Sequence, residues 1–184
     1  MNHKFPFIFL MLCFFTFQAS AQDMSRELGI RFSGLENFDF IYKKSMDGMK
    51  YKRYRLAATN IRANINEDTQ FSFNLAFAAG VEKRKNIANN LKFIHGWEPG
   101  IGLSVVAVDD DFLGNINVSL GYVLGFQYDV SDKFYINVEA IPALSVATDF
   151  EGEIFAENTI IGAGFNTNSV ALTLAYKFSS PKRK

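Results

Sequence analysis

His95 is the side chain in this sequence best suited to acid–base or metal chemistry, because it is the only histidine beyond residue 3. A catalytic role would need a positioned partner, and a metal site would need further ligands that a lone imidazole does not supply. The residues two positions before and after it, Phe93 and Trp97, are both apolar. Alternation therefore places His95 on the apolar face of a strand. We expect an interfacial polar residue there, with catalysis as the alternative.

Two short charged runs are further candidates for ligand binding. Asp109, Asp110 and Asp111 could coordinate a divalent cation through oxygen, but three successive carboxylates face one ion only on a strongly turned backbone. The run also lacks the glycine-containing pattern of a calcium loop, so we expect a solvated loop. The basic run at residues 83–85 is predicted to be a solvated turn in the same way, with binding to anionic groups as the alternative.

The more informative set consists of charged residues that share the small or polar face of alternating segments. If these segments are strands that close into a barrel of eight, the interior has room only for side chains. Opposite charges crowded there should pair, because an unpaired buried charge is costly. We predict a salt-bridged plug that closes the lumen, and a gated ion path is the alternative. The residues of this predicted network are Arg31, Arg53, Arg55, Glu82, Glu98, Glu139 and Lys177.

The elements that position these residues are long strands. Apolar and polar residues alternate over 71–82, 116–129 and 134–147. Such runs exceed the usual strand of about 5–6 residues and match the 9–11 or so that a membrane strand needs. After residue 21 no apolar run approaches the length of about 20 residues that a spanning helix requires. A closed sheet is the other structure that pairs every backbone group within lipid. We therefore predict an all-β, antiparallel transmembrane barrel with up-and-down meander topology.

Turn residues divide the chain into eight strands. The predicted turns are 34–37, 45–50, 66–69, 86–90, 109–115, 129–133 and 149–158. The predicted strands are approximately 27–34, 37–44, 50–65, 70–85, 91–108, 116–129, 133–148 and 158–178. The first hairpin is open to a second interpretation, since 27–44 could form one continuous strand and give seven in all. The shift of alternation at 166–168 predicts a bulge, and the glycines at 100, 102, 162 and 164 are expected to face the lumen or bend the barrel.

An even number of strands places both termini at the same end of the barrel. Aromatic residues are predicted to gather at that end as an interfacial girdle, which favours eight strands over seven. These aromatic residues are Tyr42, Tyr51, Tyr54, Phe93, Trp97, Phe126, Tyr128, Phe134, Tyr135, Tyr176 and Phe178.

The first 21 residues are typical of a signal peptide, so we expect residues 1–21 to be removed and 22–184 to form one barrel domain. Lys4 precedes an apolar run at 5–17, and Ala19 and Ala21 provide the small side chains of a cleavage site. A retained anchor helix is the alternative. The single cysteine, Cys13, lies in this segment, so the remainder can form no disulfide or thiolate site. Without Lys4 the chain has 18 basic and 19 acidic residues, which gives no basic surface for a nucleic acid. We expect no cofactor.

Residues 27–178 resemble small outer-membrane β-barrel proteins of Gram-negative bacteria, the outer membrane protein beta-barrel domain. The resemblance rests on Gly29-Ile30-Arg31-Phe32, on the hairpin at 125–135, and on the final strand at 170–178 with its terminal aromatic. Six residues, 179–184, follow that aromatic, where many members stop. The resemblance implies a cell outer-membrane location with both termini in the periplasm. It also implies lipopolysaccharide and other outer-membrane lipids as partners, and the barrel-assembly machinery during biogenesis.

Together these features predict a non-enzymatic outer-membrane barrel with a structural or surface-interaction role. A lipid-modifying enzyme on the same barrel is an alternative, because lumenal histidine with serine occurs in outer-membrane lipid A deacylases. A narrow ion channel is another. A soluble periplasmic ligand-binding barrel would have to turn its apolar face inward, and the small residues of the other face are unsuited to a soluble exterior.

Overall fold

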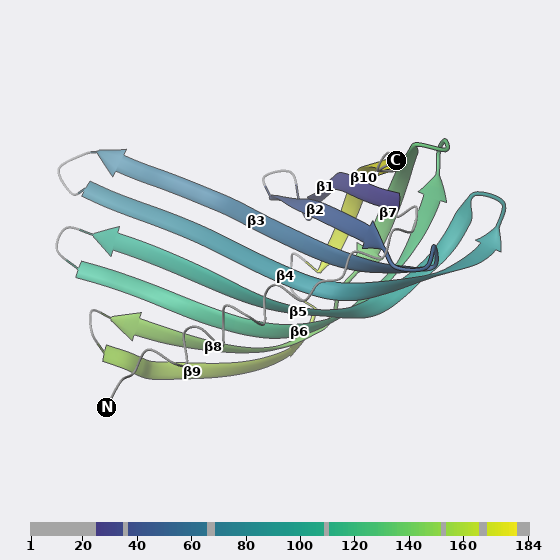
Figure 1. The fold of residues 1–184 in the computed structure, drawn as a ribbon. Coiled ribbons are helices and arrows are strands. Elements are labelled where there is room, and N and C mark those ends of the chain that lie inside the picture. Colours follow the sequence, from purple (N-terminus) through teal and green to yellow (C-terminus); the bar gives the residue numbers. More distant parts are fainter. Residues whose placement is uncertain are drawn as a thin grey trace, which may run out of the picture.

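The computed structural model describes residues 25–34, 37–65, 69–108, 111–151, 154–165 and 169–179. Figure 1 shows an all-β chain in which long strands curve around a common interior. The ten strands are β1 (Ser25–Phe32), β2 (Phe38–Ser45), β3 (Lys50–Ile65), β4 (Thr69–Ala88), β5 (Leu91–Val108), β6 (Asp111–Asp129), β7 (Phe134–Ala140), β8 (Ala143–Glu151), β9 (Ile154–Gly164) and β10 (Val170–Ser179). Among the described residues, none forms a helix long and apolar enough to cross a membrane.

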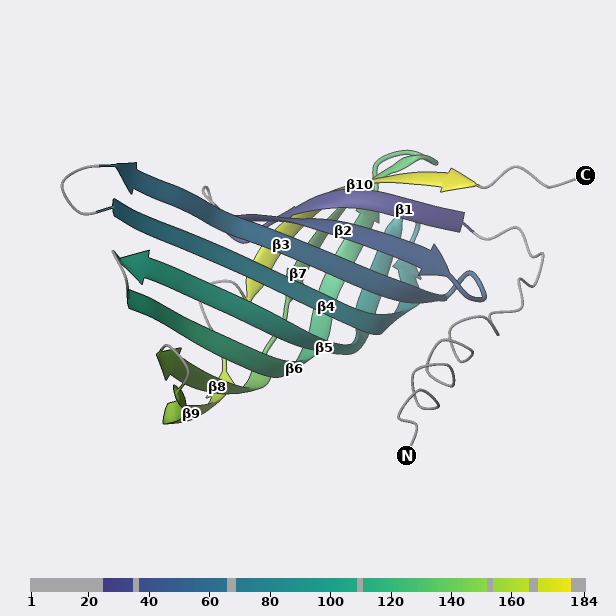
Figure 2. The ribbon, with the colours of Figure 1, turned by 60° about the vertical axis from the view of Figure 1, so that its left-hand side comes forward.

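The strands form one antiparallel sheet that closes on itself. Each strand from β1 to β6 pairs with the next along the chain. β6 then pairs with β7 at one end and with β8 at the other. β10 pairs with both β7 and β1, which closes the ring, and Figure 2 shows β10 lying beside β1. β7 continues into β8, and β9 continues into β10, so the ten segments correspond to eight strands of the barrel. The eight-stranded meander predicted from the sequence is confirmed.

The first hairpin consists of two separate short strands, so the single-strand interpretation of 27–44 is wrong. β1 and β2 pair from Arg26↔Lys44 to Phe32↔Phe38. The long strand at 134–151 is interrupted at Ile141 and Pro142, and proline has no N–H with which to continue a ladder. The partner of β6 therefore changes from β7 to β8 at this point.

The two ends of the barrel are built differently. The half drawn at the right of Figure 1 is called the lower half. It contains β1, β2, β7, β10 and the adjoining parts of β3 to β6, and its eight strands form a complete ring. The upper half contains β8, β9 and the remaining parts of β3 to β6. There β3 extends beyond its last pair with β2, Asp39↔Ala57, and from Ala58 to Ile65 pairs only with β4 among the described residues. β9 pairs only with β8 in the same part of the chain, so Figures 1 and 2 show β3 and β9 as the two edges of the upper sheet.

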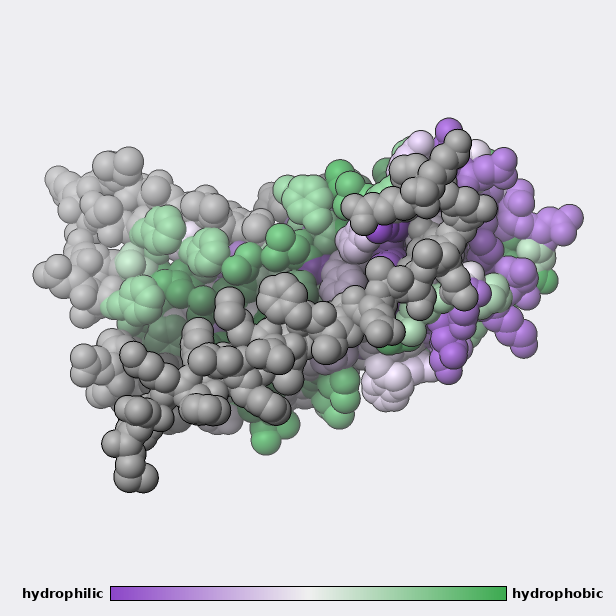
Figure 3. Space-filling view, in the orientation of Figure 1, coloured by the Kyte–Doolittle hydropathy of each residue, from purple (hydrophilic) through white to green (hydrophobic). Residues whose placement is uncertain are grey.

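Alternation separates an apolar exterior from a polar interior, as successive side chains of a strand point to opposite faces. Exposed apolar side chains include Phe40, Trp97, Val118 and Val138, whereas charged side chains are buried. Figure 3 shows hydrophobic surface over the middle of the barrel and hydrophilic surface at the end where the β2–β3 and β4–β5 hairpins turn. This distribution is the reverse of a water-soluble protein and is typical of a barrel surrounded by lipid.

Several predicted turns are shorter in the structure because strand pairing continues into polar sequence. β6 begins at Asp111 instead of residue 116, and pairing with β5 reaches Val108↔Asp111. The predicted turn at 149–158 is too long, since β8 runs to Glu151 and pairs with Ile154 of β9. The predicted signal peptide, the aspartates at 109 and 110, and the bulge at 166–168 lie outside the described residues.

The predicted aromatic girdle is correct for most of its members but wrong for two. The side chains of Tyr51 and Tyr135 are buried in the lumen, with 7% and 0% of their surface exposed. Tyr135 alternates in step with Asn137 and Glu139, which also face inward. The ring of Tyr51 lies 3.6 Å from the Arg84 guanidinium carbon and provides a cation–π contact inside the barrel.

Candidate functional site

Ten charged side chains from six strands meet inside the lower half. They occupy inward positions on β1, β2, β3, β4, β5 and β7, and nearly all of them are fully buried. Five are acidic and five are basic, so the cluster carries no net formal charge. The acids are Glu27, Asp39, Glu82, Glu98 and Glu139, and the bases are Arg31, Lys43, Arg53, Arg55 and Arg84.

Arg53 is the centre of this lumen network. Its Nη1 donates to Glu82 Oε2 at 3.1 Å and to Glu139 Oε2 at 3.2 Å, and its Nη2 donates to Glu139 Oε1 at 3.1 Å. Its Nε lies 2.6 Å from Glu98 Oε2 without the alignment of a hydrogen bond, so this contact is an ion pair only. One fully buried guanidinium thus joins carboxylates from three other strands, β4, β5 and β7.

The upper edge of the network consists of two arginines that share acidic partners. Arg31 Nε donates to Glu139 Oε1 at 2.7 Å, and its Nη1 donates to Asp39 Oδ2 at 3.0 Å. Arg55 Nη1 donates to the same Asp39 oxygen at 2.9 Å, and its Nη2 lies 2.9 Å from Glu98 Oε1. The Arg55 side chain is 23% exposed, which makes it the member of this edge that contacts the space above.

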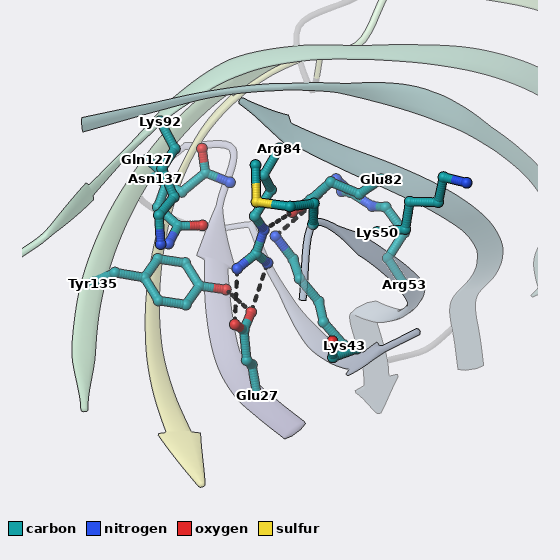
Figure 4. Close-up of polar contacts among 12 residues, drawn as sticks. Glu27, Lys43, Lys50, Arg53, Glu82, Arg84, Lys92, Gln127, Tyr135 and Asn137 are labelled. Carbon is teal, nitrogen blue, oxygen red and sulfur yellow. Dashed lines mark hydrogen bonds and ion pairs between the residues drawn. The ribbon is translucent and has the colours of Figure 1, made fainter. Parts of the chain in front are cut away.

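The lower edge is built around Arg84, as Figure 4 shows. Its Nη1 and Nη2 donate to the two oxygens of Glu27 at 2.8 and 2.7 Å, the paired geometry in which arginine binds a carboxylate most strongly. Its Nε donates to Glu82 Oε1 at 2.7 Å, and Lys43 Nζ donates to Glu82 Oε2 at the same distance. The Tyr135 hydroxyl donates to Glu27 at 2.7 Å. Glu82 therefore connects this edge to Arg53.

Lys177 faces the lumen but forms its ion pair in a second, smaller cluster, and its Nζ lies 5.5 Å from the centroid of the Tyr135 ring, which contacts the network. Its Nζ donates to Asp129 Oδ1 at 2.8 Å, and Lys92 Nζ donates to Asp129 Oδ2 at 2.8 Å. Gln127 adds a third hydrogen bond to this carboxylate at 2.7 Å. These side chains lie near the chain-terminal mouth of the barrel, because Lys177 pairs with Glu27 at the start of β1.

The structure joins the other six predicted residues and adds four that the sequence reasoning missed. Glu27, Asp39 and Lys43 follow the same alternation as Arg31, which was the signal that could have found them. Arg84 was placed in a solvated turn at 83–85, and this is wrong. β4 continues to Ala88, so Arg84 points inward while Lys83 and Lys85 point outward.

His95 lies on the outside of the barrel, away from the lumen network. Its ring stacks on Phe93 with centroids 5.7 Å apart, and its Nδ1 lies 3.2 Å from the Tyr122 hydroxyl. Trp97 also contacts Tyr122, edge to face, with ring centroids 4.7 Å apart. These contacts make His95 part of an aromatic cluster on the outer wall of β5 and β6.

A cavity of 520 Å³ lies directly above the lumen network. Its floor is formed by Arg31, Arg55 and Glu98, so the upper edge of the network closes the cavity from below. Small side chains and glycines form its walls, and β9 contributes Gly162 to Gly164. The other wall residues are Ala76, Asn117, Ser119, Gly121, Ile141, Ala143, Ser145, Phe165 and Ser169. The predicted lumen-facing position holds for Gly100 as well, whose nearest neighbour atoms include Ser119 Oγ and Ala78 Cβ.

Comparison with known proteins identifies similarity in fold. No family model matches the chain, and no curated protein matches it. Among solved structures it is similar to Neisserial surface protein A, with a TM-score of 0.48 and 11% identity over 85% of this chain and 95% of that one. It is also similar to Ail, the attachment invasion locus protein of Yersinia pestis, with a TM-score of 0.42 and 14% identity over 85% and 97% of the two chains.

Proposed function

We propose that this chain is a non-enzymatic protein of the bacterial outer membrane, with a sealed lumen and a structural or surface-interaction role. The observation that carries the proposal is the lumen network, in which five acids and five bases neutralise one another across the lower half. An eight-stranded ring has room for little beyond such side chains. The apolar exterior supports a position within lipid.

The proposed orientation has both termini in the periplasm. The start of β1 pairs with the end of β10, Ser25↔Ser179, so the two ends of the barrel chain lie at the lower mouth. The upper half, with its cavity, then faces the outside of the cell and its lipopolysaccharide. The last strand, which ends in Tyr176 and Phe178, would present the barrel to the assembly machinery. Any recognition of other molecules is assigned to the upper half.

The paired charges argue against the ion-channel alternative. An ion passing through the lower half would have to separate groups held at 2.6–3.2 Å, and each separated charge would remain buried. The lipid-modifying alternative receives no support from His95, whose contacts are with Phe93 and Tyr122 on the outer wall.

Conductance in planar bilayers tests the proposal. The wild-type barrel should insert without steady current, whereas the double variant Arg53→Ala, Glu139→Ala should conduct. It removes one base and one acid from the centre of the lumen network and leaves the charge balanced. Lys133→Ala, in the exposed turn at 130–133, is the control and should behave as the wild type. A stable, ion-selective current through the wild-type barrel would show that the lumen is an open path.

A further inference from the structure

The outer face of β1 to β4 carries a row of basic side chains at the lower end of the barrel. Lys44 lies between Arg26 on β1 and Lys52 on β3 in the strand register, and Lys50 is paired with Lys83 of β4. Like charges placed opposite each other across strands destabilise a sheet. An anion placed beside the row would relieve this repulsion. We call it the basic belt, and its members are Arg26, Lys44, Lys50, Lys52, Lys83 and Lys85.

Among the described residues, the carboxylates of β1, β2 and β4 point away from the basic belt. Glu27, Asp39 and Glu82 all point into the lumen and are engaged in the network there. Asp47, in the turn at 46–49, lies 3.9 Å from Lys50, but its carboxylate mainly accepts hydrogen bonds from the Lys50 and Met49 amides, which hold the pKa of Asp47 below its usual range. In the described part of the chain, Arg26 Nε is buried without a hydrogen-bond partner.

The height of the basic belt matches the headgroup region of a bilayer. Tyr42 and Tyr54 stack with ring centroids 6.2 Å apart. Tyr42 lies two residues before Lys44, and Tyr54 lies two residues after Lys52. Above them, Phe40 and Leu56 are exposed on the apolar wall. Two residues of a strand span about 7 Å, so Lys44 and Lys52 lie one such step outside the level of these tyrosines, where polar headgroups begin.

The opposite side of the same rim has a different chemistry. The outward residues at the lower ends of β5, β6, β7 and β10 include Phe93, Tyr128, Phe134 and Tyr176. Lys92 of β5 faces inward and binds Asp129. Most outward lysines of the rim lie on β1 to β4, whereas the exposed Lys133, in the turn at 130–133, is on the other side. Their concentration on β1 to β4 indicates a local anionic partner.

We infer that the basic belt binds the phosphates of anionic glycerophospholipids, such as phosphatidylglycerol, in the leaflet around the lower half. This inference rests on the proposed membrane location and orientation, in which that leaflet is the inner one. Lysine and arginine bind phosphate oxygens through charge-assisted hydrogen bonds. Near an anionic membrane surface each basic residue favours binding by about 1 kcal/mol, which is roughly fivefold. The adjoining apolar wall would hold the acyl chains of the same lipids.

Spin-labelled lipids provide the test. The full barrel is reconstituted in phosphatidylcholine vesicles, and the fraction of spin-labelled phosphatidylglycerol or phosphatidylcholine immobilised by the protein is compared. We expect the wild type to prefer phosphatidylglycerol at least tenfold. The triple variant Lys44→Gln, Lys83→Gln, Lys85→Gln should lose most of that preference. The matched triple variant with arginine at these positions, and Lys133→Gln in the turn at 130–133, should retain it.

The outcomes separate this inference from the proposed function. Insertion into the neutral vesicles is measured in the same samples by protease protection and by heat-dependent mobility on gels. A barrel that fails to insert would overturn both proposals. An inserted barrel without preference for phosphatidylglycerol, or one whose preference survives the glutamine substitutions, overturns the inference alone. Selective immobilisation of spin-labelled lipid A in place of phosphatidylglycerol also overturns it.

Discussion

The interiors of the two halves of this barrel contain different kinds of side chain. In the lower half, long charged side chains from facing strands fill the ring and neutralise one another. In the upper half most of the described residues that line the interior are small, among them Ala76, Ser119 and Ser145, and they leave a cavity of 520 Å³. Arg55 marks the boundary, because its guanidinium is paired from below and partly exposed above.

The difference shows that strand length determines where charged side chains can be buried in the interior. β1 and β2 are each 8 residues long and complete the ring only at the lower end, whereas β3, β4 and β5 have 16, 20 and 18 residues. Buried charges are tolerable only where partners surround them on every side. A complete ring provides such partners, and a sheet with two separated edges does not. The ten charges of the lumen network accordingly lie within the complete ring.

The largest effect is expected for a variant that breaks the lower half. Glu139→Ala removes the carboxylate shared by Arg31 and Arg53 and leaves both guanidinium groups short of a partner. Removing one member of a buried pair costs about 3–5 kcal/mol. The free energy of unfolding in detergent, measured by denaturant titration, should fall by that amount. Asp132→Ala, in the exposed turn at 130–133, should leave it unchanged, and equal losses in the two variants would contradict a special role for the network.

A matched pair of glycine variants compares the packing of the two halves directly. A Cβ on Gly29, in the lower half, would lie 2.7 Å from the Leu174 carbonyl oxygen and 2.8 Å from Ala175 Cβ. A Cβ on Gly102, in the upper half, would meet nothing closer than 3.8 Å. Gly29→Ala should therefore cost about 1–3 kcal/mol through overpacking, and Gly102→Ala should change stability by less than about 0.5 kcal/mol. Denaturant titration of both variants checks this difference, and similar costs would mean that the upper half is packed as tightly as the lower.

The smallest effect on function is expected on the outer wall. His95→Ala removes a contact with the Tyr122 hydroxyl, worth about 1 kcal/mol at most for an ordinary hydrogen bond. Folding and envelope lipid composition should stay unchanged, because His95 lies on the outer wall, in an aromatic cluster away from the lumen network. Mass spectrometry of lipid A from cells that express the wild type or the variant measures this. A reproducible change in lipid A acylation at equal protein abundance would favour the lipid-modifying alternative.

Alternation in the sequence was sufficient to predict which residues face inward. Arg53 and Arg55, Glu98 and Glu139 all lie in the lumen as their strand phase requires. The errors arose where local composition was weighed above that phase. Arg84 was taken as part of a turn because lysines flank it, and Tyr135 was taken as a rim aromatic although it alternates with Asn137.

The sequence by itself thus determined the strands, their two faces and the closed sheet, because side-chain period and turn residues are local properties. Which charges meet is not local. Arg31 and Glu139 are 108 residues apart in the sequence, and they meet at 2.7 Å because β10 brings β1 and β7 to either side of it. Arg53 likewise meets carboxylates from three other strands. Only the register of the closed ring decides these partners, because a one-residue slip between strands would turn every one of these side chains to the other face.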